Sequence, residues 1–140
     1  MRVLLDTNVI LDLFLDRAPF ADAAAVLWLA HEREQLDAYV AAITPVNLFY
    51  IARKLRDEKT ARQAVVELLA TLNVCTIEQG TLKSALSLPF RNYEDAVQHA
   101  AASATGLEAI ITRNAKDYSA ATLPIFMPDD FIQQYLPTMG

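Results

Sequence analysis

The chain is 140 residues long, 54% of them apolar and 3 of them glycine, which is enough to bury the core of one domain. Its formal net charge of −5 argues against a protein that holds nucleic acid by overall charge alone. No apolar run approaches the roughly 20 residues that cross a bilayer, and Met1-Arg2 leads directly into a strand-like segment. We therefore expect neither a membrane partner nor a signal peptide. The single Cys75 cannot form an internal disulfide, which fits a cytoplasmic location.

Short apolar runs alternate with segments of helical character along the chain. The first run, from Arg2 to Leu5, is apolar after its first residue, as expected for a strand covered on both faces. Cys75 lies in another such run and is expected to be a buried thiol. Strands are predicted over residues 2–5, 36–43, 73–77, 109–112 and 124–127. Helices are predicted over residues 9–15, 21–34, 45–55, 59–72, 81–88, 94–105 and 128–136.

The clearest predicted helix start follows the second strand. Thr44 is a favourable N-cap, Pro45 suits the first helical position, and Asn47 would then be the third helical residue. Near the other end of the chain, Gly106 is expected to terminate the Ala-rich helix that begins at Glu94.

Strands that alternate with helices indicate a parallel sheet with helices on both faces. The predicted fold is therefore a three-layer α/β/α arrangement around a mostly parallel sheet of four or five strands. With no internal repeat or domain break, residues 1–140 are expected to form one domain.

Three carboxylates from distant segments are predicted to meet at one edge of this sheet. Asp6 directly follows the first strand, Asp117 lies in the loop after the fourth, and Asp95 stands near the start of a helix. Ligands of such sheets bind beyond the carboxyl ends of the strands. Each residue also has a simpler interpretation: Asp6 could cap a helix, Asp95 could oppose the helix dipole, and Asp117 could stabilise a turn.

Like charges that converge destabilise one another unless a cation lies between them. Mg²⁺ or Mn²⁺ is the expected ion, because hard cations take oxygen ligands and the sequence offers no Cys/His set for zinc.

With these residues, the chain resembles the PIN-domain ribonucleases, most closely the VapC-like toxin branch and its stand-alone relatives. The resemblance covers nearly the whole chain. The matching stretches are Val3-Leu4-Leu5-Asp6-Thr7-Asn8-Val9-Ile10, Ala42-Ile43-Thr44-Pro45-Val46-Asn47-Leu48, Tyr93-Glu94-Asp95-Ala96-Val97 and Ile111-Thr112-Arg113-Asn114-Ala115-Lys116-Asp117-Tyr118.

The resemblance implies that Asp6, Asp95 and Asp117 are the catalytic, metal-binding acids. It also implies that nearby polar side chains support them, namely Thr7, Asn8, Thr112 and Asn114. The family's second acid, usually Glu, falls on Asn47, which offers a carbonyl oxygen but no charge. Glu94, which is adjacent to Asp95, could partly substitute for that second acid, although neighbouring helical residues point about 100° apart.

The function that the resemblance implies is Mg²⁺- or Mn²⁺-dependent hydrolysis of RNA phosphodiester bonds. The chain would be the toxin of a type II toxin–antitoxin system or a stand-alone relative, with a cognate antitoxin as a possible partner and a homodimer as its assembly. Arg113 and Lys116, which flank the site, are candidates for binding the RNA backbone. Arg53, Lys54 and Arg56 are further candidates, or simply a solvated helix face.

Two other function classes stay open. A catalytically weakened PIN domain that binds RNA or protein is favoured by Asn47. A phosphatase with Asp6 as its nucleophile usually carries a second acid two residues later, where this chain has Asn8. His99 lies one helical turn after Asp95 and is interpreted as a contact to that carboxylate or as a helix-surface histidine. Trp28, Phe49 and Tyr50 are expected in the core or at an interface.

Overall fold

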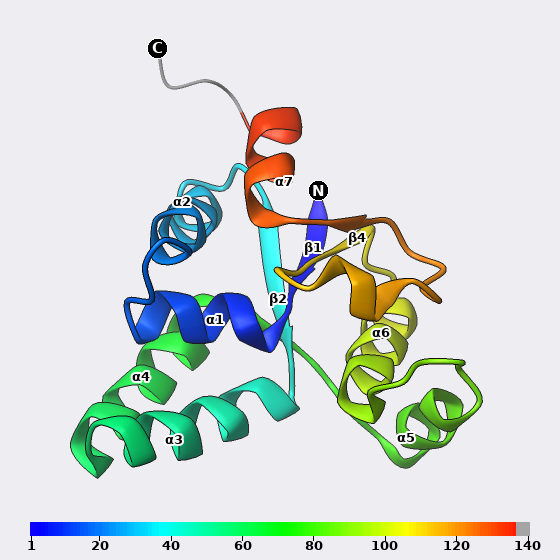
Figure 1. Ribbon diagram of the computed structural model, residues 1–140, viewed down its shortest axis with the longest axis horizontal. Coiled ribbons are helices and arrows are strands. Elements are labelled where there is room, and N and C mark those ends of the chain that lie inside the picture. The colour runs from blue at the N-terminus through cyan, green and yellow to red at the C-terminus, as the bar shows by residue number, and fades with distance from the viewer. Residues whose placement is uncertain (137–140) are drawn as a thin grey trace.

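A computed structural model describes residues 1–136 and shows a three-layer α/β/α fold (Figure 1). All strand pairs of its five-stranded sheet are parallel, in the order β3-β2-β1-β4-β5. The strands are β1 Arg2–Leu5, β2 Asp37–Ala41, β3 Asn73–Cys75, β4 Ala109–Ile111 and β5 Ile125–Phe126. The helices are α1 Thr7–Phe14, α2 Ala21–Glu32, α3 Ile43–Leu55, α4 Glu58–Thr71, α5 Gln79–Leu86, α6 Tyr93–Thr105 and α7 Pro128–Tyr135, with a 3₁₀ helix η1 at Ala115–Tyr118. The predicted fold class is confirmed.

Successive residues of the central strands face opposite layers. In β1, Val3 and Leu5 pack into the core formed with α1, α2, α3, α4 and α7, whereas Leu4 packs against α6 and η1. Figure 1 shows the same division, with α1 to α4 on one side of the sheet and α5 and α6 on the other. These side chains are almost fully buried, because an internal parallel strand has helices over both of its faces.

Several predicted boundaries shift by one or two residues, and local backbone geometry explains some of these shifts. Helix α2 ends at Glu32, because Glu34 adopts a left-handed conformation with φ of 59° that cannot continue a helix. Strand β3 stops at Cys75, whose thiol is buried as expected. Gly106 ends α6 with φ of 76°, which confirms its predicted role.

The prediction that Thr44 caps α3 is wrong. The helix begins at Ile43 with Ala42 in the cap position, so Thr44 lies within the first turn. Its hydroxyl instead lies 2.8 Å from the hydroxyl of Thr7, and both residues are buried. A tertiary hydrogen bond has therefore replaced the local capping bond that the sequence suggested.

Pairing between β1 and β4 fixes the edge at which the site forms. Leu5 is in register with Ile111, so the next residues, Asp6 and Thr112, leave the sheet side by side. The Asp6 backbone N–H continues the ladder by donating to the Ile111 carbonyl at 2.9 Å. Within the described residues, no helix is long and apolar enough to cross a membrane.

Candidate active site

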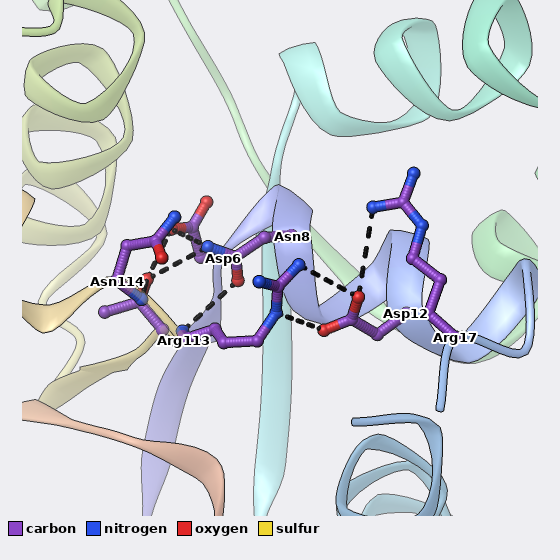
Figure 2. A network of polar contacts seen from close by, with 7 residues as sticks. Asp6, Asn8, Asp12, Arg17, Arg113 and Asn114 are labelled. Atoms are coloured by element: carbon purple, nitrogen blue, oxygen red, sulfur yellow. Dashed lines mark hydrogen bonds and ion pairs between the residues drawn. The ribbon is translucent and has the colours of Figure 1, made fainter. Parts of the chain in front are cut away.

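Asp6 occupies the N-cap position of α1, but its side chain makes no capping hydrogen bond. Asp6 is 4% exposed, and its carboxylate accepts three side-chain hydrogen bonds, two of them from distant segments. Thr112 Oγ1 donates at 2.7 Å, Gln98 Nε2 at 2.9 Å and Asn8 Nδ2 at 3.2 Å. Figure 2 shows Asp6 between Asn8 and the strand end that leads to Asn114. This carboxylate is therefore held in place by α1, α6 and the end of β4.

Gln98 is a site residue that the sequence analysis missed. It is fully buried, and its amide accepts a hydrogen bond from the Thr7 backbone N–H at 3.3 Å while donating to Asp6. The available signal was its spacing, because Gln98 lies three residues after Asp95 and hence near the same helix face. One amide side chain thus ties the end of β1 to α6.

The predicted acids line one open hollow of about 360 Å³ at the carboxyl edge of the sheet. Asp6 comes from the end of β1, Asp95 from the first turn of α6, and Asp117 from η1. The polar side chains that also line the hollow are Thr7, Asn8, Asn47, Asn92, Glu94 and Asn114. The structure therefore brings the three sequence-predicted carboxylates to one place, together with Glu94.

The convergence of these carboxylates changes their acidity. Burial and the nearby charges of Asp6, Asp117 and Glu94 raise the pKa of Asp95 to about 7. Burial and the charge of Asp6 also raise the pKa of Glu94. Tyr118 donates a long hydrogen bond of 3.5 Å to Asp95, which partly offsets these effects. The raised pKa of Asp95 reflects how strongly the neighbouring carboxylates disfavour further negative charge in the hollow.

Asn47 and Glu94 form a direct pair across the hollow. The Asn47 Nδ2 donates to Glu94 Oε1 at 2.9 Å, which joins α3 to the start of α6. Glu94 and Asp95 both line the hollow even though they are sequence neighbours, because the N-terminal end of α6 faces it. A carboxylate therefore stands beside position 47, although position 47 itself carries none.

Arg113 is oriented away from the hollow. Its guanidinium binds Asp12 through Nε at 2.7 Å and Nη2 at 3.1 Å, and it stacks over Phe20 at 4.2 Å from the ring centre. Figure 2 shows Asp12 between Arg113 and Arg17. Substrate binding by Arg113 stays a prediction. In the structure its guanidinium pairs with Asp12. Lys116 is exposed on η1, beside the hollow but outside its lining.

The interpretation of His99 as a helix-surface residue is wrong. Its ring is 2% exposed, and Nε2 accepts a hydrogen bond from the Thr122 backbone N–H at 3.0 Å. Burial lowers the pKa of His99, so the neutral ring is favoured. The second interpretation, a contact to Asp95, gains no support because the polar contact of His99 is with Thr122.

The three aromatic residues singled out in the sequence differ in environment. Trp28 is in the core and packs edge to face on Phe14, as expected. Phe49 is partly buried, whereas Tyr50 is 56% exposed. Arg53 lies over the rings of Phe49 and Tyr50 at 5.8 and 5.1 Å, so this candidate RNA-binding cation already contacts its own helix.

The donors of the hollow fit a hard divalent cation. Every polar side chain that lines it offers a carboxylate, amide or hydroxyl oxygen, and no thiolate or imidazole is among them. Within residues 1–136, no three ligating side chains are already gathered closely enough to enclose an ion. Mg²⁺ needs no such cage, because it usually retains several waters and takes one or two carboxylates.

An acidic hollow at the carboxyl edge of a parallel sheet places the chain among α/β/α proteins with a candidate site for a hard cation. The chain belongs to the PIN domain family, whose family model matches residues 2–116. None of the curated proteins matches the chain significantly.

Solved structures share the fold over most of their length. A toxin–antitoxin complex from Klebsiella pneumoniae is 27% identical with a TM-score of 0.66, covering 90% of this chain and 97% of that one. DNA-bound VapBC from Salmonella typhimurium is 17% identical with a TM-score of 0.71, covering 91% and 98%. VapC20 from Mycobacterium tuberculosis, described as a sarcin-ricin loop cleaving toxin, is 13% identical with a TM-score of 0.63, covering 77% and 86%. With identities of 17% and 13%, the similarity to the last two structures shows a shared fold and no more.

Proposed function

We propose that this chain is a Mg²⁺- or Mn²⁺-dependent endoribonuclease, the toxin of a type II toxin–antitoxin system or a stand-alone relative. The observation that carries the proposal is the convergence of Asp6, Glu94, Asp95 and Asp117 on one hollow. Membership of the PIN domain family and the likeness to a Klebsiella pneumoniae toxin–antitoxin complex support it.

Asp6, Asp95 and Asp117 would hold the ion. A bound Mg²⁺ or Mn²⁺ lowers the pKa of a water and offsets charge that develops on the phosphate during hydrolysis. The carboxylate of Asp6 is fixed by Gln98 and Thr112, so its position is set before any ligand arrives. Asp95, which lines the same hollow, would orient the attacking water or accept its proton.

Glu94 would supply the negative charge that Asn47 lacks. Asn47 donates to Glu94 Oε1 at 2.9 Å, which orients this carboxylate at the hollow where the cation would bind. In this arrangement Asn47 positions an acid instead of being one. Asn8 and Thr112 would support Asp6, to which both side chains donate, and Asn114 would act through its backbone N–H, which donates to Thr112 Oγ1.

The proposal extends to partners and location. Four acids around an open hollow attract a basic side chain as well as a metal ion, so an antitoxin could block the site with an inserted Arg or Lys. Lys116, and Arg113 if it leaves Asp12, would contact the RNA backbone. A cytoplasmic homodimer is the assembly that the family resemblance implies.

The test is cleavage of a mixed single-stranded RNA by the purified protein with Mn²⁺, beside calorimetric titration of Mn²⁺. Asp6→Asn and Asp95→Asn should abolish both cleavage and metal binding. Asp129→Asn, which changes a carboxylate on α7 outside the hollow, should leave both unchanged. Cleavage that survives EDTA or both site variants would refute the proposal.

A catalytically weakened PIN domain that binds RNA or protein remains the second candidate, because Asn47 replaces the usual acid. The two functions differ in their response to Asn47→Glu. A binding module should gain metal affinity and activity from the added charge. An active enzyme that already uses Glu94 should gain little, because a fifth acid would repel the other four.

A further inference from the structure

A second cavity adjoins the carboxylate hollow. It has a volume of about 250 Å³, and its walls are Ile43, Ile77, Leu82, Tyr93 and Val97. Asn47 and Glu94 line both this cavity and the carboxylate hollow, so the two spaces meet at that hydrogen-bonded pair. A ligand held by the carboxylates can therefore extend directly into an apolar space.

Tyr93 forms a fixed aromatic wall of this cavity. Its hydroxyl donates to the Leu82 carbonyl at 2.9 Å, which tethers the ring to α5. The residue is nevertheless 46% exposed and lines the cavity, so part of it is open to a ligand. Because Tyr93 is the first residue of α6, it directly precedes Glu94 and Asp95 of the carboxylate hollow. A ring held in this way loses little conformational entropy when a ligand stacks on it.

The chemistry of the lining restricts what can occupy the cavity. No Lys or Arg contributes to it and its one charged residue is Glu94, so the cavity disfavours a phosphate. Its volume lies just below the roughly 300–1,000 Å³ of pockets for drug-sized ligands, which suits one small planar group. A nucleobase is planar, uncharged and apolar on both faces, and proteins bind single-stranded RNA by stacking unpaired bases on aromatic side chains.

We propose that this cavity is a nucleobase subsite, in which Tyr93 stacks on the base of a nucleotide next to the bound phosphodiester. The proposal rests on the proposed function, which places an RNA phosphate at the adjoining carboxylates. The apolar walls recognise the face of the base, so the subsite selects an unpaired nucleotide over a base-paired one. An RNA strand would thus be held by its backbone at the carboxylates and by one base beside them.

The experiment uses ten-nucleotide single-stranded RNAs, with Ca²⁺ replacing Mn²⁺ so that binding is measured without hydrolysis. One series carries the fluorescent base 2-aminopurine at successive positions, and a second carries an abasic residue there. For the wild type, stacking on Tyr93 should quench the fluorescence at one position. The abasic residue at that position should weaken binding about 5- to 150-fold, the loss expected for one stacked base.

Variants assign the effect to the cavity. Tyr93→Ala should remove the quenching and weaken binding of the intact RNA to the level of the abasic one. Tyr93→Phe, which keeps the ring and loses the tether to Leu82, should retain most of the affinity. Tyr135→Ala is the matched control, since Tyr135 is 45% exposed on α7 and does not line the cavity. Calorimetry should show unchanged Mn²⁺ binding for Tyr93→Ala.

The wild type could bind intact RNA and every abasic RNA with equal affinity. That result would overturn the subsite and would favour an apolar side chain of a protein partner as the occupant of the cavity. This comparison needs no variant, so it holds even if Tyr93→Ala fails to fold. Failure of the proposed function is a different result: the wild type would then neither bind Mn²⁺ nor cleave RNA. RNA cleavage with no dependence on Tyr93 would refute the subsite alone.

Discussion

Replacing Gln98 with leucine would remove both hydrogen bonds of this buried amide while keeping a side chain of similar volume. The Asp6 carboxylate would lose the donor at 2.9 Å, and hydrogen bonds to charged groups contribute about 1.5–3 kcal/mol. The Thr7 backbone N–H would lose its acceptor at 3.3 Å, and an unsatisfied buried donor costs about 1–3 kcal/mol. Because Thr112 and Asn8 still donate to Asp6, we expect a total loss of about 3 kcal/mol.

The measurement is urea-induced unfolding at pH 7, followed by circular dichroism, for the wild type and Gln98→Leu. A loss of about 3 kcal/mol is a large part of the roughly 5–15 kcal/mol that stabilises a domain, so the midpoint should fall clearly. Gln133→Leu is the matched control, because Gln133 is exposed on α7 and such a change is usually within about 0.5 kcal/mol. Mn²⁺ binding should also weaken in Gln98→Leu, since Asp6 loses part of its support.

An unfolding free energy within about 0.5 kcal/mol of the wild type, together with unchanged Mn²⁺ binding, would refute this reasoning. It would mean that the buried amide does not hold Asp6 and Thr7 as the structure indicates. Weaker Mn²⁺ binding without a loss of stability would instead retain the link to Asp6 and refute only the energetic estimate.

Mn²⁺ should bind about tenfold more tightly at pH 8 than at pH 6, because Asp95, with a pKa raised to about 7, must lose its proton; calorimetry would show equal affinities if this is wrong. The same raised pKa means that protonated Asp95 stabilises the metal-free protein, and this stabilisation is lost as the pH rises through about 7. The unfolding free energy of the wild type, measured in urea, should therefore fall over this range. That of Asp95→Asn should not show this decline. Gly106→Ala should lower the unfolding free energy by about 1–2 kcal/mol because φ is 76°, whereas Gly80→Ala in α5 should raise it by about 0.5–1 kcal/mol. Asp12→Ala should cost about 2–4 kcal/mol by leaving the half-buried Arg113 guanidinium unpaired, and a neutral effect would contradict that pairing.

The sheet and its order of layers could be predicted because they depend on local patterns. A fully apolar run such as Val3-Leu4-Leu5 is the pattern of an internal parallel strand, and the intervening helices then follow from chain length and periodicity. The same reasoning placed Asp6 and Asp117 at one edge, since carboxyl ends of parallel strands share an edge. Both residues do line the hollow there.

What the sequence analysis missed depends on contacts between segments far apart in the chain. Thr44 has the composition of an N-cap, yet its hydroxyl bonds to Thr7, 37 residues away. Gln98 donates to Asp6 across 92 residues, and Arg113 binds Asp12 across 101. None of these partners can be chosen from local propensity, because each depends on how α1, α3 and α6 pack around the strand ends.

Position 47 shows how a gap in a motif can mislead when residues are judged singly. Taken alone, Asn47 removes one negative charge from the expected set of acids and favours a loss of metal binding. In the folded chain it donates to Glu94, and that carboxylate lines the same hollow as Asp6, Asp95 and Asp117. The charge of the hollow thus depends on which side chains converge there in the fold, and an acid on one helix can replace an acid missing from another. For that reason Glu94→Gln should weaken Mn²⁺ binding more than Asn47→Ala, and the double variant Asn47→Glu/Glu94→Gln should recover much of the loss.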